Sequence, residues 1–430
     1  GLSCAYELAR LGHDPIVLEA SGRAGGHVRT LKDPFADGLY ADVGAEHFYY
    51  PGYTRFWSYI KEFGLTPVAY PRRDQLLRFF KTGGVYSEAD LRSATILNKL
   101  EFNSRECAFL AEHPWSELPL LYFSKYVEAI RDERNPFEGN LRELDSISVG
   151  DLLQKEGASV GAVRHFGGSG SALHMIWGAA VKKLRGTPFE SKKLFRLLGG
   201  NQAMTDAFAA RLKERVRCGS PVTQLEHSGS GVTVTSTVMG EPKKFEADYL
   251  VIAISLAVLR QMQVTPAWPE SKNYLVQQMP YTTKTRVVFQ TRTRFWETDK
   301  VSPNWSSSDP KLSELWAMAE ELKTPRGILV GGSQPGVSAA ATRGAFLQSY
   351  SGKSADIEHI TLHEWAKDPW AGMCERSTYR PGDLTRFWPE AGRPVGRVHF
   401  AGAYAAQMSW GMEAALESAH LAAKAIDQAA

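Results

Sequence analysis

The chain begins with the stretch GLSCAYELARLG, residues 1–12, followed by HDPIVLE, residues 13–19. The first stretch reads as a helix that starts at Gly1, and the second as a short apolar strand that ends in the carboxylate of Glu19. This order is typical of the G-x-G-x-x-G dinucleotide-binding motif, in which the last glycine opens the helix and a carboxylate about 20 residues further on holds a ribose hydroxyl. We therefore expect Gly1 to be the last glycine of the motif, with a strand and two glycines upstream of it.

The residues that follow the strand add to this expectation. They read EASGRAGGHVRT, residues 19–30. Arg23 and Arg29 can supply fixed positive charge for a diphosphate, because arginine offers planar, bidentate donors. Gly25 and Gly26 let the backbone approach a ligand without a Cβ in the way. An ordinary basic, glycine-rich turn is the alternative interpretation.

The same stretch resembles the E-A-x-x-R-x-G-G-R-x-x-T signature of FAD enzymes of the monoamine oxidase and L-amino-acid oxidase superfamily. The resemblance implies that Glu19, with Ala20 beside it, accepts hydrogen bonds from the adenosine ribose. His27 departs from the signature, which has arginine at that position. We therefore expect the phosphate contact there to be weaker or to be supplied by Arg29.

A second segment, LLGGNQAM at residues 197–204, continues the resemblance. It leads into an expected helix at 205–215 and then into expected strands at 222–226, 232–234 and 247–254. This order matches the family's second FAD segment, in which the position of Val222 lies against the adenine.

The chain closes with GRVHFAGAY, residues 396–404, then WGMEAA, residues 410–415, and a final helix. These segments resemble the F-A-G-E and G-[YW]-M-E-G-A box at the flavin end of FAD, which implies that Gly402 binds the cofactor. A helix that starts at Met412 would direct free backbone N–H groups and a positive dipole at the flavin N1/O2 locus. Negative charge develops there when the flavin is reduced.

Three residues of this last box depart from the family pattern. Ala403 replaces the acidic residue and removes one expected hydrogen bond to the ribityl chain. Gly411 stands where the family has an aromatic ring beside the flavin, which leaves one wall open to a bulkier substrate. Trp410 could fill that wall instead, because a glycine neighbour permits unusual backbone angles.

Together the three boxes imply an α/β (α+β, two-domain) fold over essentially all 430 residues. A Rossmann-like FAD-binding domain is expected from the separated segments 1–75, 190–275 and 390–430. A mixed sheet and a helical cover are expected to form the substrate domain from residues 76–189 and 276–389. Within it, we expect amphipathic helices at 96–111, 115–131 and 149–155 and strands at 285–290 and 327–331.

Composition limits the partners and the compartment. The net charge of +3 is too small to favour nucleic acid or an anionic membrane surface. The longest apolar run, residues 249–259, is about 11 residues and too short to span a bilayer, and no membrane anchor is expected. Four widely separated cysteines give neither a disulfide framework nor a zinc spacing, so we expect a cytoplasmic protein without a metal site.

The resemblance implies a flavin oxidase that acts on a C–N bond. FAD would take a hydride from the carbon next to nitrogen, leaving an imine or iminium, and dioxygen would reoxidise the flavin to give hydrogen peroxide. The substrate stays open among an amine, an amino acid and an amide, including one in natural-product biosynthesis whose product cyclises or hydrolyses. A desaturase or isomerase of the same fold, acting on C–C bonds, is the alternative. A homodimer is compatible with this assignment, and the oligomeric state stays open.

A basic residue near the flavin is the first candidate for a catalytic role. In the family, the strand that precedes an F-W pair carries a lysine that holds a water near flavin N5. Counting back from Phe295-Trp296 places Arg286 at this position, with Lys284 two residues earlier on the same strand face. Arginine stays protonated at working pH, so the role would change character. A register shifted by two would give the role to Lys284.

Glu46 is the second candidate. It follows Gly44 and Ala45, a stretch that in the family passes the flavin ring and opens the substrate cavity. A carboxylate there could pair with a cationic amine, or act as a base with its pKa raised by burial. A solvent-facing glutamate at a strand end is the alternative.

Cys374 precedes the segment RPG, residues 380–382, at the spacing where monoamine oxidases attach flavin covalently through cysteine. Its neighbours Met373 and Glu375 differ from the Gly and Tyr of the family. A free thiol is therefore expected, with covalent flavin as the alternative.

Overall fold

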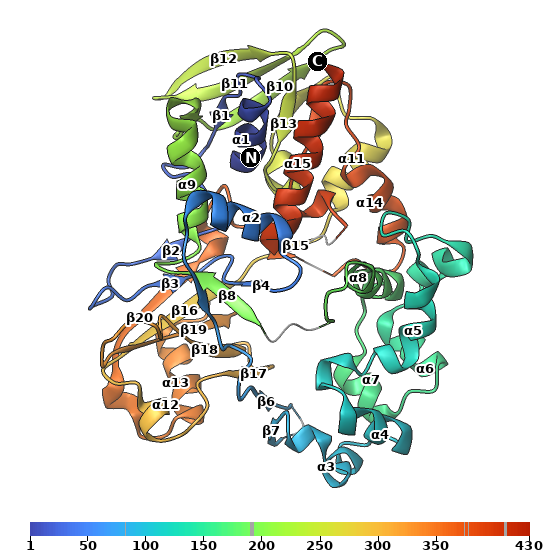
Figure 1. The fold of residues 1–430 in the computed structure, drawn as a ribbon, viewed down its shortest axis with the longest axis vertical. Helices are drawn as coiled ribbons and strands as arrows, with labels where there is room; N and C mark the ends of the chain where they lie inside the picture. The colour runs from blue at the N-terminus through green and yellow to red at the C-terminus, as the bar shows by residue number, and fades with distance from the viewer. Residues whose placement is uncertain (82, 190–192, 374, 377, 408–410) are drawn as a thin grey trace.

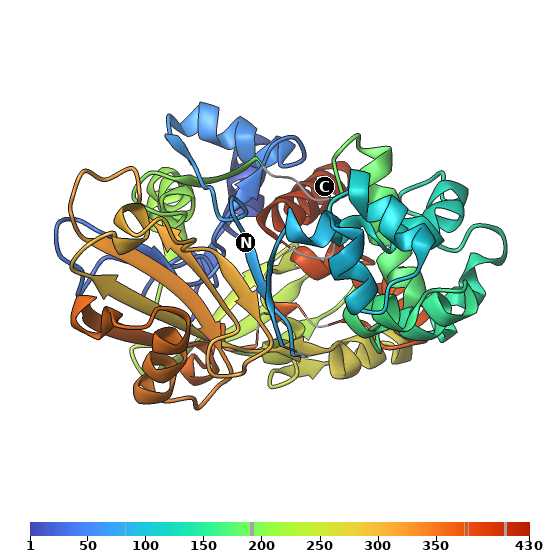
Figure 2. The same cartoon turned by 90° about the horizontal axis from the view of Figure 1, so that it is seen from below.

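The computed structural model describes residues 1–81, 83–189, 193–373, 375–376, 378–407 and 411–430. Figure 1 shows three lobes: an upper lobe that holds both termini, a lower sheet lobe and a lower helical lobe. Seen from below in Figure 2, the sheet lobe and the helical lobe stand on opposite sides of a central region. The mixed α/β architecture confirms the expected fold class.

The upper lobe is built from segments that are distant in the sequence. Helix α1 (Leu2–Arg10) packs against α9 (Gln202–Leu212) and α15 (Gly411–Ala429). Beside them lie two parallel strand pairs, β1–β9 and β13–β22, and a four-stranded sheet in the order β12-β11-β10-β14. The strand bounds are β1 Val17–Leu18, β9 Val216–Arg217, β10 Val222–His227, β11 Val232–Val238, β12 Glu241–Ala247, β13 Leu250–Ile252, β14 Gln263–Thr265 and β22 Val398–Phe400.

The sheet lobe contains, among the described residues, a seven-stranded mixed sheet in the order β20-β16-β19-β18-β17-β6-β7. Its strands are β6 Leu77–Phe79, β7 Val85–Ser87, β16 Thr285–Thr291, β17 Trp305–Ser307, β18 Glu314–Met318, β19 Gly327–Ser333 and β20 Ile357–Glu364. Strands β16 and β19 confirm the two strands expected there. One face of the sheet packs on α13 (Ala339–Ser349) through Phe289 and Phe346.

The opposite face of the sheet belongs to the main core. Because side chains alternate along a strand, Val288, Val330 and Trp316 share this face and join the core cluster that reaches into the other lobes. Arg286, Gly332 and Glu314 lie one step along the same three strands on the same face. We call the sheet, with this face toward the main core, the sheet floor.

The helical lobe runs from residue 94 to residue 184. Its helices are α3 Ala94–Lys99, α4 Ser104–Glu112, α5 Leu120–Ala129, α6 Val149–Lys155, α7 Val160–Phe166 and α8 Ala172–Leu184. The expectation of a single helix at 96–111 is wrong, because the helix is interrupted between α3 and α4. Glu101 takes a left-handed φ of 65°, and Asn103 starts α4 with a capping box to Glu106.

Several short strands and helix α2 lie between the lobes near the centre. Strand β8 (Leu194–Leu197) lies between β4 (Phe48–Tyr49) and β5 (Pro67–Ala69), and β2 (Thr30–Leu31) pairs with β3 (Ala41–Asp42). Helix α2 (Thr54–Phe63) contacts α15.

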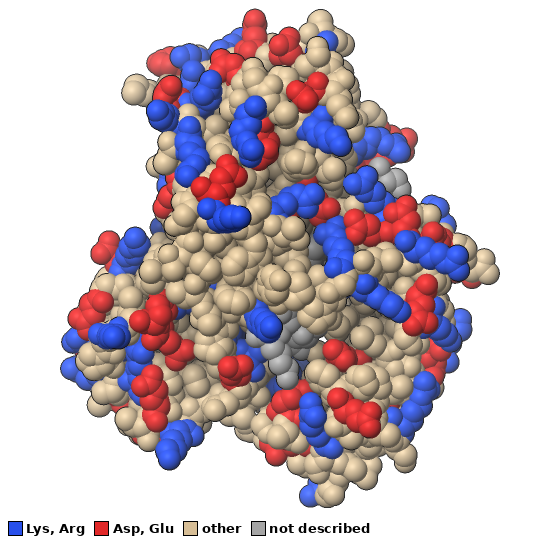
Figure 3. Space-filling view, viewed as in Figure 1, with Lys and Arg blue, Asp and Glu red and all other residues tan. Residues whose placement is uncertain are grey.

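On the face shown in Figure 3, acidic and basic side chains are mixed, and the surface is hollowed between the two lower lobes. Among the described residues, no helix is long and apolar enough to cross a membrane.

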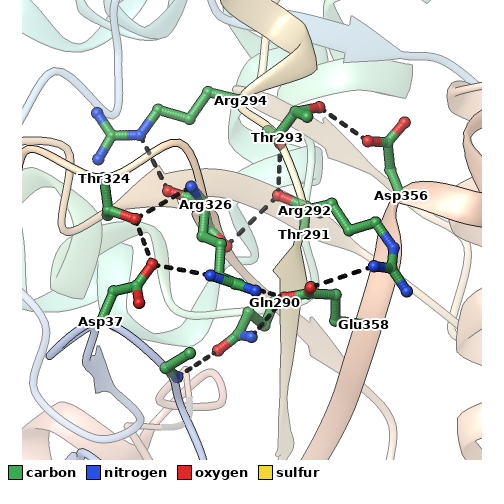
Figure 4. A network of polar contacts seen from close by, with 12 residues as sticks. Asp37, Gln290, Thr291, Arg292, Thr293, Arg294, Thr324, Arg326, Asp356 and Glu358 are labelled. Carbon is green, nitrogen blue, oxygen red and sulfur yellow. Dashed lines mark hydrogen bonds and ion pairs between the residues drawn. The ribbon is translucent and has the colours of Figure 1, made fainter.

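A polar network fixes the loop after β2 to the far end of the sheet floor (Figure 4). Asp37 accepts from the Thr324 hydroxyl at 2.6 Å and pairs with Arg326 at 3.1 Å. Arg326 also donates to Glu358 on β20 at 2.8 Å. The Gln290 side chain on β16 accepts from the backbone amide of Ala36 at 2.8 Å. Hydrogen bonds that involve residues of β16 and β20 therefore hold this loop against the sheet.

Candidate active site

A row of residues crosses the sheet floor from β16 to β18. Arg286 on β16 lies opposite Gly332 on β19, and Glu314 on β18 lies opposite the same glycine from the other side. The Glu314 side chain lies over Gly332, and Arg286 donates from Nη1 to Glu314 Oε1 at 3.0 Å. Lys284, just before β16, reaches the same oxygen from its Nζ at 3.3 Å. Arg286 and Lys284, the two alternatives for the flavin-proximal cation, therefore share one carboxylate.

Arg72 and Glu46 complete a ring of alternating charge above this row. One terminal nitrogen of Arg72 pairs with Glu46 Oε1, and the other donates to Glu314 Oε2 at 2.9 Å. Arg286 Nη2 lies 4.0 Å from Glu46 Oε2, which closes the ring. The Arg72 guanidinium stacks on the Trp316 ring, 3.8 Å from its centroid. We call these four charged residues, Arg72, Glu46, Arg286 and Glu314, the ion ring.

The ion ring decides the charge of Glu46. Burial would raise the pKa of this carboxyl, but Arg72 and Arg286 outweigh burial and hold the pKa well below its usual range. The expectation that burial raises the pKa of Glu46 is therefore wrong, because two guanidinium groups lie next to it. Burial lowers the pKa of the adjacent His47 despite its contact with Glu46. Glu46 is buried and ionised, which makes it a weak base and a strong partner for a cation.

The first sequence box, residues 19–30, forms a tight turn after β1. Glu19 accepts a hydrogen bond from the Ser21 amide at 2.9 Å. The Arg23 guanidinium donates to the backbone carbonyls of Gly26 and Val28, so it braces the turn. A Cβ added at Gly26 would meet no heavy atom within 4 Å, and one at Gly1 would meet only Ala253 at 3.4 Å. The backbone at Gly26 therefore faces open space, whereas Gly1 lies in contact with Ala253.

Gly44 shows the closest backbone approach in this region. A Cβ at Gly44 would overlap the carbonyl oxygen of His27, which also accepts from the Ala45 amide at 3.1 Å. The His27 ring packs against Trp365 with 4.2 Å between ring centroids, and the Trp365 indole donates to the Val43 carbonyl at 2.7 Å. His27 thus has an aromatic contact where the signature has arginine.

Asp42 joins two of the sequence boxes and was not found by sequence reasoning. Its Oδ1 accepts from the Thr30 hydroxyl at 2.6 Å and from the Asn201 amide at 2.9 Å. Its Oδ2 is buried and has no hydrogen-bond partner among the described residues. Asn201 in turn donates its side-chain amide to the Ala45 carbonyl at 3.1 Å. Burial raises the pKa of Asp42 to about 7.

The C-terminal box is anchored by a carboxylate. Glu413 accepts from the backbone amides of Arg55 and Phe56, both at 2.9 Å, and so satisfies the first turn of α2. A Cβ at Gly411 would lie 2.6 Å from the Tyr53 hydroxyl. The expected opening at Gly411 is therefore wrong on that side, because Tyr53 fills the space.

The other residues predicted at this end lie as follows. Met412 is buried in the first turn of α15. The Gly402 amide donates to the Ser418 hydroxyl at 2.9 Å, and Ala403 starts a short 3₁₀ turn. Val222 starts β10, opposite Ser236 on β11. Trp410 and Cys374 fall outside the described residues.

Sequence reasoning missed Arg72, Glu314, Trp316, Asp42, Asn201 and Tyr53. Two of them carry a signal in the sequence: Glu314 is the one acidic residue in the strand ELWAM, and Asp42 interrupts the apolar stretch LYADVGA. A charged side chain at such a position needs a partner. Arg72 has no comparable signal, since it lies in a polar connection after β5.

We predict that Asp42→Asn changes the pH dependence of stability. The folded pKa of about 7 lies above the unfolded value of 3.8, so the folded protein retains a proton that the unfolded chain has lost between these values. Stability should fall as pH rises from 4 to 7, by at most about 1.4 kcal/mol per pH unit. Urea unfolding across this range should show that slope in the wild type and a flatter one in Asp42→Asn. Equal slopes would contradict the assignment.

We also predict that Gly44→Ala destabilises the protein by about 1–3 kcal/mol or more, because the new methyl group would displace the His27 carbonyl. Gly22→Ala is the matched control, since a Cβ there meets nothing within 4 Å. Thermal unfolding and flavin content of the two purified variants measure the difference. Comparable behaviour of both variants would show that the close approach at Gly44 is unimportant.

Comparisons with known proteins agree with this geometry. The family described as "Flavin containing amine oxidoreductase" matches residues 1–427. The chain is 25% identical to an L-amino-acid oxidase of Vipera ammodytes ammodytes, over 100% of this chain and 91% of that protein. It is also 25% identical to an L-amino-acid oxidase of Demansia vestigiata, over 100% and 85% of the two chains.

Two solved structures share the fold. Putrescine oxidase bound to putrescine superposes with a TM-score of 0.81 at 19% identity, covering 99% of this chain and 96% of that one. Cyclohexylamine oxidase from Brevibacterium oxydans gives a TM-score of 0.81 at 20% identity, covering 100% and 96%. With the family match over almost the whole chain, the protein belongs to the flavin-containing amine oxidoreductases and oxidises an amine with FAD.

Proposed function

We propose that this enzyme oxidises an amine whose substrate molecule carries a second, cationic group, and that Glu46 binds this second group. The observation that carries the proposal is the state of the Glu46 carboxylate: it is buried and ionised, and its Oε2 accepts no hydrogen bond from any described residue. A buried, ionised oxygen without a donor is costly. A substrate ammonium would supply that donor.

The charge of Glu46 also indicates which nitrogen it binds. An amine must be neutral to give up a hydride from its neighbouring carbon, whereas an adjacent carboxylate favours the protonated ammonium. The nitrogen held by Glu46 is therefore not the reacting one. Glu46 orients the substrate through its distant cation, and the reacting nitrogen lies farther from the carboxylate.

The remaining side chains of the floor bind and orient the substrate. FAD supplies the hydride-accepting chemistry when bound. Arg286 and Lys284 hold fixed positive charge at the floor, and Trp316 offers an aromatic surface beside Arg72. The Tyr70 hydroxyl and Trp316 Nε1 are buried without a hydrogen-bond partner among the described residues, so both have capacity to contact a ligand. A place for Trp410 on the wall beside the flavin stays a prediction from the sequence.

Residues of all three boxes are proposed to hold FAD. The open backbone at Gly26 fits a dinucleotide that runs along this turn. The full set of proposed cofactor residues is Gly1, Glu19, Ala20, Arg23, Gly25, Gly26, His27, Arg29, Gly44, Ala45, Val222, Gly402, Ala403, Gly411 and Met412.

Several finer points belong to the same proposal. Dioxygen reoxidises the flavin, FAD is not attached through Cys374, and the enzyme works in the cytoplasm as a homodimer. The free state of Cys4, Cys107 and Cys218 supports a reducing compartment. The FAD-binding domain comprises 1–75, 190–275 and 390–430, and the substrate domain the two intervening segments.

An amino acid is the second candidate substrate. Around the ion ring, three cations (Arg72, Arg286 and Lys284) face two carboxylates, Glu46 and Glu314. The surplus positive charge would suit a substrate carboxylate. An amide substrate with later cyclisation remains a prediction from the sequence alone.

We predict that Glu46→Gln weakens recognition of a diamine. The KM for a diamine should rise about 10- to 100-fold, the loss expected when a hydrogen bond between charged groups is removed. The KM for the monoamine of the same chain length should change little, and kcat should change little for both. Initial rates of peroxide formation measure these constants.

Glu358→Gln is the control for this variant, because it removes a carboxylate at the far end of the same sheet (Figure 4). Equal losses for diamine and monoamine, or a loss confined to kcat, would contradict the binding role of Glu46. A wild-type preference for amino acids, lost on substitution of Arg286, would favour the second candidate.

We predict that Arg286→Met slows flavin reduction or reoxidation while FAD stays bound, and that Lys284→Met does little. Arg286 is 5% exposed at the floor, whereas the Lys284 side chain is 31% exposed. Anaerobic and aerobic stopped-flow traces at the flavin absorption band separate the two half-reactions. The reverse pattern would assign the role to Lys284.

A further inference from the structure

The Glu314 side chain can reach over β19 to meet Arg286 because Gly332 has no side chain. Neighbouring strands lie about 4.8 Å apart, so Arg286 and Glu314 are separated by the full width of β19. A Cβ at Gly332 would lie 2.8 Å from Glu314 Oε1 and 3.4 Å from its Cγ. Space, rather than an unusual backbone angle, is therefore what this position requires.

Glu314 holds three cations in place at once. Its Oε1 accepts from Arg286 at 3.0 Å and from Lys284 at 3.3 Å, and its Oε2 accepts from Arg72 at 2.9 Å. Among the described residues, Glu46 has one guanidinium within hydrogen-bonding distance, that of Arg72, and Arg286 Nη2 stays 4.0 Å from Glu46 Oε2. The position of Arg286 thus reflects a competition between two carboxylates, which Glu314 wins.

We propose that Glu314 and Gly332 are positioning residues that keep Arg286 away from Glu46 Oε2 and so leave that oxygen available to the substrate cation. Without the Glu314 carboxylate, the Arg286 guanidinium moves the short distance to Glu46 and neutralises it. The inference rests on the proposed role of Glu46 for its effect on binding. Its structural part, the move of Arg286, stands independently of that role.

The first test is direct. Crystal structures of the FAD-loaded wild type and of Glu314→Gln should show the distance from Arg286 Nη2 to Glu46 Oε2 shortening from 4.0 Å to hydrogen-bonding range. Gly332→Ala, whose new methyl group displaces the Glu314 carboxylate, should give the same movement. Gly344→Ala on α13, where a Cβ meets nothing within 4 Å, is the folding control. An unchanged Arg286 in Glu314→Gln would overturn the inference.

The second test measures binding without turnover. tert-Butylamine has no hydrogen on the carbon next to nitrogen, so the enzyme cannot oxidise it, and its ammonium probes the cation site by calorimetry. We expect Glu314→Gln and Gly332→Ala to weaken its binding to the holoenzyme about tenfold, as Glu46→Gln should. In the Arg286→Met background, Glu314→Gln should cause no further loss, because no guanidinium remains to occupy Glu46.

The outcomes separate the two proposals. Full binding by Glu46→Gln, or no binding by the wild type, would contradict the cation-binding role of Glu46 itself. Weak binding by Glu46→Gln together with full binding by Glu314→Gln would overturn only the positioning role. An equal loss from Glu314→Gln with and without Arg286 would also overturn it, since the effect would then not pass through Arg286.

Discussion

The bridge that Arg72 makes between Glu46 and Glu314 is the interaction on which the site depends. It joins a loop of the central region to strand β18 of the sheet floor. Arg72 and Glu314 are 242 residues apart in the sequence. Removing one member of a buried ion pair leaves the other charge uncompensated, which costs far more than the pair contributes. Each charge of the ion ring is therefore compensated by its neighbours, and the ring fixes the floor in one arrangement.

Glycines make this arrangement possible by letting charged or polar groups approach across the backbone. Gly332 lets the Glu314 carboxylate lie over strand β19, and Gly44 lets its own segment approach the His27 carbonyl. In both cases a methyl group would meet an oxygen atom. The same argument applied to Gly25 and Gly26 predicts a dinucleotide turn from the sequence, whereas the need for Gly332 depends on Glu314 of the neighbouring strand.

Features set by neighbouring residues could be predicted from the sequence, whereas features set by distant contacts could not. The helix after Gly1, the strands β16 and β19 and the order of the three boxes follow from local patterns of glycines and apolar residues, and the structure has them. The charge of Glu46 could not be predicted, because it is set by Arg72 and Arg286, which are distant in the sequence. The break between α3 and α4 was missed because the apolar periodicity continues through it, although the cap at Asn103 was visible. The filling of the space at Gly411 by Tyr53 likewise depends on a long-range contact.

With the role proposed for Glu46, its ionised state also constrains how a proton can leave the substrate. A carboxylate whose pKa is held below its usual range takes up a proton poorly, since a base works best when its pKa lies near the working pH. His47, the nearest other titratable side chain of this segment, has a lowered pKa as well. The reacting amine must therefore reach the flavin already neutral, and the acidity of the substrate rather than of a protein base should govern how the reductive step depends on pH. Binding a second cationic group at Glu46 fits this requirement, because it orients the molecule without stabilising the proton on the nitrogen that reacts.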